Sequence, residues 1–120
     1  MPRASVSLTL LAGWLFLAVV GQAEAHHGWS GYDASRTLEV MGAIKASGYE
    51  HPHGFVSVEA AGKTWLVVLA PPSRMERRGL SRDMLKPGNV VTVVGYPSRS
   101  DPNEMRAERI TVGGTTIELR

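Results

Sequence analysis

The chain has 120 residues, which is room for one domain, and its formal net charge of +2 is too small to indicate a nucleic-acid partner. The absence of cysteine excludes disulfides, thiolate metal sites and thiol catalysis. Beyond an apolar N-terminal segment about 95 residues remain, above the size at which a hydrophobic core alone becomes marginal. The domain must therefore be held together by packing.

The first 25 residues have the features of a cleavable secretory signal peptide. Arg3 supplies the positive start, residues 6–20 are almost entirely apolar, and Ala23-Glu24-Ala25 is the small-x-small pattern that signal peptidase recognises. We predict cleavage after Ala25, with cleavage after Ala23 as the alternative. The mature protein is then periplasmic or secreted, and it contacts the membrane only transiently through the signal peptide. As an alternative, an uncleaved N-terminal anchor would hold the same domain on the outer face of the membrane that it spans.

An arm rich in Gly and Ser over residues 26–36 precedes a single β-rich domain over residues 37–120. Alternating apolar residues predict a half-buried first strand, in which Gly42 indicates a bulge or bend. The apolar run Trp65–Leu69 predicts a well-buried third strand. Strands are expected over 37–46, from 55, and over 65–69, 90–96, 104–112 and 116–119.

One helical connection lies between the third and fourth strands. Ser73 and Glu76 match a capping box that opens a helix, Gly79 ends it, and Ser81 begins a second short turn. Three strands, a helical connection and two or three further strands follow the order of an OB-type barrel. We therefore predict an all-β fold with one short helix, a small five- to six-stranded OB-like barrel. A short β-sandwich is the alternative.

Four histidines form two clusters: His26 and His27 at the start of the arm, and His51 and His53 in the loop before the second strand. Neutral imidazole is the commonest protein ligand of Cu, Zn and Ni. Pro52 stiffens the loop and so limits the entropy that its histidines lose on ligation. This clustering predicts a divalent transition-metal site.

Either cleavage site favours copper. With His26 as the first residue, its amine and ring chelate one ion, and His53 or His51 adds a third nitrogen in a histidine brace. With Glu24 first, the amine, two backbone amides and the His26 imidazole can wrap a square-planar Cu(II) or Ni(II). Tetragonal nitrogen coordination favours Cu(II) over Zn(II). The alternative is that all four histidines are solvated surface residues.

Other side chains have both functional and structural interpretations. Trp29 and Tyr32 either wall a site or pin the arm to the barrel, while Asp33 and Glu50 are oxygen ligands or plain turn residues. A group of arginines on the helical insertion is either a solvated face or a surface for an acidic partner. These are Arg74, Arg77, Arg78 and Arg82.

The sequence resembles DUF6152, a bacterial family of small exported proteins of unknown function. The resemblance rests on His26-His27, Tyr32-Asp33, Thr37-Leu38, Pro52-His53, Trp65, Pro72, Arg77-Arg78-Gly79, Leu85-Lys86-Pro87-Gly88 and Val91-x-Val93-x-Gly95-Tyr96-Pro97. The family's loop usually reads Asn-Pro-His, so His51 departs from it, and His53 is the better ligand candidate. The resemblance implies export and a small β-barrel, and it brings no established activity.

We therefore expect an exported protein that binds a metal ion, copper first, through His26, His53, His27 and His51. The alternative is a metal-independent binding or assembly module for a periplasmic protein or glycan partner. A copper oxidoreductase is a further option, but the chain is short for a substrate platform. No nucleophile–base pair or phosphate loop indicates a catalytic residue or another cofactor.

Overall fold

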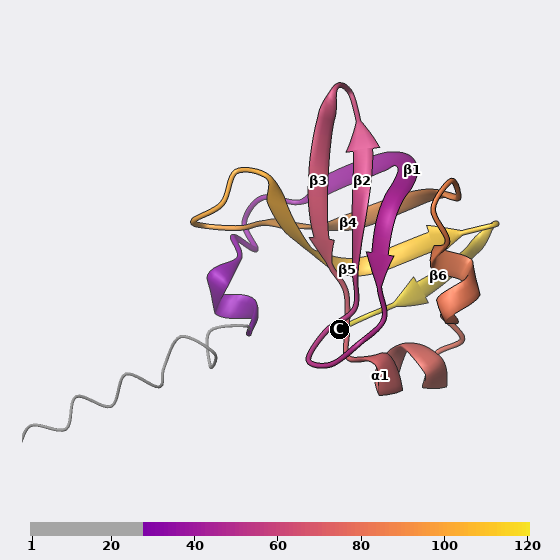
Figure 1. Cartoon of the computed structure of the whole chain (residues 1–120). Helices are drawn as coiled ribbons and strands as arrows, with labels where there is room; N and C mark the ends of the chain where they lie inside the picture. The colour runs from indigo at the N-terminus through magenta and orange to yellow at the C-terminus, as the bar shows by residue number, and fades with distance from the viewer. Residues whose placement is uncertain (1–27) are drawn as a thin grey trace, which may run out of the picture.

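The computed structural model describes residues 28–120. The predicted signal peptide, His26 and His27 lie outside the described residues. Nine elements follow in chain order (Figure 1). They are η2 (Trp29–Gly31), β1 (Leu38–Gly48), β2 (Phe55–Ala60), β3 (Lys63–Val68), α1 (Pro72–Arg77), η3 (Arg82–Leu85), β4 (Val90–Pro97), β5 (Glu104–Val112) and β6 (Thr115–Glu118).

The strands form a closed barrel, as predicted. The sheet order is β3-β2-β1-β4-β5-β6, and a parallel pairing of β3 with β5 closes the first five strands on themselves. All other strand pairings in the described chain are antiparallel, and β6 extends the wall beyond β5. With α1 between β3 and β4, this confirms the OB-like barrel over the β-sandwich.

Strand β1 bends so that it pairs with two neighbours. Its first half pairs with β4, and its second half pairs with β2 across a register shift between Ile44 and Ala46. A Cβ atom on Gly42 would lie 2.1 Å from the Glu59 carbonyl oxygen, so this close approach requires glycine. The predicted irregularity of β1 is present, but it lies between Ile44 and Ala46, just past Gly42.

The core lies inside the barrel and is made of alternate residues of each strand. On β3, Val67 is fully buried while Leu66 is 38% exposed. The prediction that the whole apolar run is buried was therefore wrong, because a barrel wall has an outer face and β3 alternates across it. The largest fully buried side chains include Ile44, Leu69, Met75, Leu80, Leu85, Met105, Ile110 and Leu119.

Helix α1 lies at one end of the barrel, at the opposite end from the β2–β3 turn (Figure 1). It begins with Pro72 in its first turn and has no side-chain cap, so the predicted capping box is wrong. Proline suits this position because its missing N–H would be unpaired there anyway. Gly79, with φ +87°, follows the helix as predicted. Within residues 28–120, no helix has the length and apolar character needed to cross a membrane.

Candidate functional site

The N-terminal arm is fixed to the barrel by backbone and side-chain bonds. The Asp33 N–H donates to the Pro97 carbonyl, and the Arg99 N–H donates to the Gly31 carbonyl, each at 2.9 Å. The Tyr32 hydroxyl donates to Glu104 Oε2 at 2.9 Å. Burial and the Glu104 carboxylate raise the pKa of Tyr32 well above its ordinary value, so the phenol remains a donor. Of the two interpretations of this tyrosine, pinning the arm is the one observed.

Arg106 forms the centre of the site beneath the arm. It lies on the outer face of β5, yet it is only 5% exposed, because the arm covers it. Its guanidinium carbon is 4.5 Å from the centroid of the Trp29 ring, and the Arg120 guanidinium carbon is 4.6 Å from the same centroid. Trp29 also meets Tyr96 edge-on, with centroids 6.0 Å apart. Burial lowers the pKa of Arg106, although an arginine stays charged at any ordinary pH.

His53 reaches this cluster from the loop between β1 and β2. Its Nε2 lies 3.5 Å from Nη2 of Arg106. The contact follows from strand register, because Phe55 pairs with Val68 and Val68 pairs with Arg106, which sets the three residues in one row. His53 is two residues before Phe55. The loop histidine and the arm therefore meet at one guanidinium.

The two loop histidines differ in burial. His51 is exposed, whereas His53 is half-buried. Within residues 28–120, no three His, Asp or Glu side chains converge as metal donors. His26 and His27, the other two histidines of the sequence, lie outside residues 28–120.

Two further groups have structural roles. Asp33 Oδ1 accepts hydrogen bonds from the Ser35 N–H and hydroxyl, which hold the pKa of Asp33 below its ordinary value. Asp33 is thus a turn residue. Arginines of the helical insertion donate to backbone carbonyls of the C-terminal segment and of the loop after β1. These bonds are Arg74 to Leu119, Arg78 to Glu118 and Arg120, and Arg82 to Tyr49.

Sequence reasoning did not single out Arg106 or Arg120. Glu104 and Arg106 alternate with buried residues on β5, which is the ordinary pattern of a strand with one solvated face. Only the position of the arm in three dimensions turns Arg106 into a covered residue. No spacing in the sequence signals that contact.

An apolar groove adjoins His53 on the outer face of β2 and β3. Its volume is about 410 Å³. Phe55 and Leu66, each 38% exposed, are among the few large apolar side chains on the described surface. The groove is lined by Pro52, His53, Gly54, Phe55, Leu66 and Val68.

The closed five-stranded wall with its helical connection makes this a small OB-like β-barrel protein. The model of DUF6152, a family of unknown function, matches residues 15–106, and the chain belongs to that family. The predicted resemblance is confirmed. No curated protein sequence matches the chain.

Solved structures share the fold at low sequence identity. A complex of TiaS with a transfer RNA and ATP aligns with 74% of the chain at 19% identity and a TM-score of 0.51. A ZRD-deleted TiaS mutant in complex with agmatine aligns with 73%, also at 19% identity and a TM-score of 0.51. The chain spans only 20% and 25% of those two structures. At this identity the likeness concerns the fold alone.

Proposed function

We propose that this protein is exported and binds a divalent transition metal, copper first, with His53 as the loop ligand. His26 and His27 of the arm supply the remaining donors, and His51 is the alternative loop donor. One observation carries the proposal: Trp29, three residues after His26, packs against the same guanidinium that contacts His53.

Chain connectivity supports a common site for the two histidine clusters. One residue spans at most about 3.6 Å, so the three residues from His26 to Trp29 reach at most about 11 Å, a length that allows both clusters to donate to one ion. Arg106 Nη2 is a donor only, so its contact fits a His53 tautomer whose Nε2 lone pair faces Arg106. A metal takes the same lone pair. Binding through Nε2 therefore requires Arg106 to yield its contact.

The charge around His53 favours copper over metals that bind nitrogen ligands more weakly. Burial first, and then the charges of Arg74 and Arg120, lower the pKa of Arg106. Arg120 also pairs with Glu108 at 3.7 Å, so the cluster keeps a net positive charge. A positive field opposes a dication, and hard cations held mainly by charge are disfavoured there. A metal ion that binds here must form bonds to nitrogen ligands that are strong enough to offset the electrostatic repulsion. Copper(II) binds nitrogen ligands most strongly among the divalent first-row metals.

The apolar groove beside His53 favours a second candidate, a metal-independent binding module. Exposed Phe55 and Leu66 lie on the β2–β3 face, which OB-type barrels commonly use for ligands. At the end of α1, Arg78 donates to the C-terminal backbone, whereas Arg77 is exposed and can contact a partner. This candidate predicts that replacing Phe55 by Ser weakens partner binding with or without copper.

A competition titration with Cu(II) tests the metal proposal. The exported chain is recovered, its N-terminus is fixed by intact mass, and its copper affinity is measured against a chelator of known affinity. His53→Ala should weaken binding by at least about 100-fold, because it removes a donor and not merely an outer contact. The matched control is His51→Ala, an exposed change in the same loop, which should lower the affinity less than threefold. Unchanged affinity in His53→Ala would contradict the proposal.

A further inference from the structure

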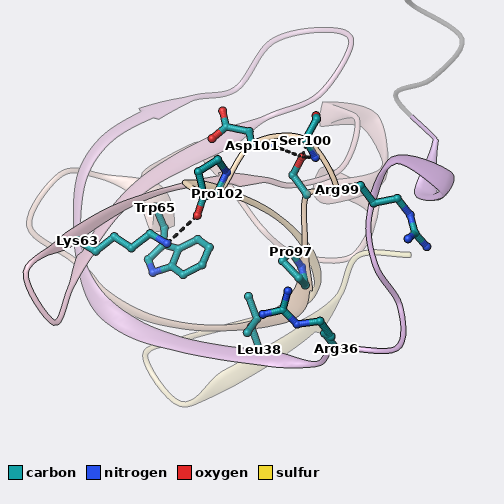
Figure 2. Close-up of a pocket in the computed structure, with 10 residues that line it drawn as sticks. Arg36, Leu38, Lys63, Trp65, Pro97, Arg99, Ser100, Asp101 and Pro102 are labelled. Atoms are coloured by element: carbon teal, nitrogen blue, oxygen red, sulfur yellow. Dashed lines mark hydrogen bonds between the residues drawn. The ribbon is translucent and has the colours of Figure 1, made fainter.

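The end of the barrel opposite α1 contains a pocket of about 530 Å³ (Figure 2). Its floor is formed by Leu38, Trp65 and Pro97. Each of these residues is an even number of positions from the buried residues of its own strand, so its side chain lies on the inner face of the barrel. Loop residues 98–102 form one rim. This is the open mouth of the barrel, with a volume within the range of small-molecule sites.

Two cationic side chains face this floor. Lys63 Nζ lies 3.7 Å from the centroid of the Trp65 ring and donates to the Pro102 carbonyl at 2.6 Å. These contacts fix the ammonium over the indole. Arg36 lies beside Leu38 and Pro97, on another side of the same opening (Figure 2). Within residues 28–120, neither cation forms an ion pair with a carboxylate.

The other charged groups of the rim are engaged elsewhere. Asp101 Oδ1 accepts from the Asn103 N–H, and the Asp101 carboxyl group points away from the indole (Figure 2). Arg99 Nε donates to the Ser30 carbonyl of the arm. The charge that faces the opening is therefore positive, and it comes from Lys63 and Arg36.

We propose that the barrel mouth binds a small organic anion, with an aromatic ring against the Leu38 and Pro97 part of the floor and a carboxylate between Lys63 and Arg36. The floor supplies apolar contact area, and the two cations supply charge-assisted hydrogen bonds. A neutral ligand of the same shape gains only the first of these. The mouth thus selects by charge as well as by shape.

This site is independent of the proposed metal site. The β2–β3 turn separates Lys63 from Ala60 at one end of the hairpin, whereas His53 precedes β2 at the other end. His53→Ala should therefore leave anion binding unchanged. Failure of either proposal can be recognised without reference to the other.

An NMR titration of the purified chain tests the proposal. Naphthalenecarboxylate is the probe, and naphthalenemethanol is the neutral probe of matched shape. The indole N–H signal of Trp65 should shift with the carboxylate, and the alcohol should bind at least about fivefold more weakly. Equal binding of the two probes, or shifts confined to Phe55 and Leu66, would overturn the proposal.

Variants separate the role of the cations from the fold. Lys63→Gln and Arg36→Gln should each weaken carboxylate binding about fivefold, and added salt should weaken it further. Lys45→Gln is the matched control, because Lys45 is exposed and pairs with Glu59 on the barrel wall. Equal effects of Lys63→Gln and Lys45→Gln would overturn the proposal. Trp65→Phe keeps an aromatic floor and should retain the preference for the anion.

Discussion

Two groups of basic side chains lie on this barrel, and they differ in what covers them. Arg106 is 5% exposed beneath the arm, with aromatic rings and His53 around it. Lys63 and Arg36 lie at an open mouth above an apolar floor. A covered cation fixes one segment to another, whereas a cation at an open pocket remains available to a ligand. Coverage by the arm therefore decides the role of each basic group.

The largest expected effect is a loss of stability at the covered cation, Arg106. Trp29→Ala removes the ring that lies against Arg106 and Arg120 and meets Tyr96 edge-on. A desolvated cation–π contact and an aromatic pair together contribute about 2–3 kcal/mol. Urea unfolding should show a loss of this size, and Trp29→Phe should recover part of it. A loss below about 0.5 kcal/mol would show that the arm does not stabilise the barrel.

The second effect is a pH dependence that Tyr32 imposes. Its pKa is raised in the folded state, so the stability that it contributes is complete below its ordinary pKa of 10.0 and is lost as pH rises beyond that value. Tyr32→Phe should lose about 1 kcal/mol at neutral pH, through the hydrogen bond to Glu104. Its stability should also fall less steeply above pH 10 than that of the unmodified chain. Parallel pH profiles would contradict this account of Tyr32.

A smaller effect is expected on copper affinity, and it tests the positive electrostatic field around His53. Arg120→Gln removes a half-exposed charge next to Arg106, so copper affinity should rise about two- to fivefold. Arg77→Gln, on the exposed side of α1, is the control with no expected change. A fall in affinity on changing Arg120 would mean that its charge assists the metal site.

The smallest expected effect concerns Lys63, the cation at the open barrel mouth. Lys63→Gln should change the free energy of unfolding by less than about 1 kcal/mol, because its cation–π contact and its bond to Pro102 are partly solvated. Differential scanning calorimetry measures this directly. A loss as large as that of Trp29→Ala would make Lys63 a structural residue and would remove the contrast between the two groups.

The sequence predicted the barrel well because its strands alternate and its turns carry glycine. The range 104–112 matches β5, and Ala61 and Gly62 occupy the β2–β3 turn with positive φ. The helix start was mispredicted because Pro72 competes with the Ser73–Glu76 motif for the first turn, and proline needs no side-chain cap there. Local patterns thus determined the elements more reliably than their ends.

The candidate sites were only partly predictable. His53 was identified from residue type and spacing, but its contact with Arg106 depends on the row that runs through Phe55 and Val68. The barrel mouth brings together Arg36, Lys63 and Pro97 from separate strands and loops. Such convergence arises from closure of the sheet, and no local sequence pattern carries it.

Electron paramagnetic resonance of the exported chain with one equivalent of Cu(II) tests the central claim, that the arm and the His53 loop share one metal site. The account predicts tetragonal nitrogen coordination that loses one nitrogen donor in His53→Ala and stays unchanged in His51→Ala. Identical nitrogen hyperfine structure in the unmodified chain and in His53→Ala would contradict it. The arm would then bind the metal alone, or the spectrum would report only loosely held copper.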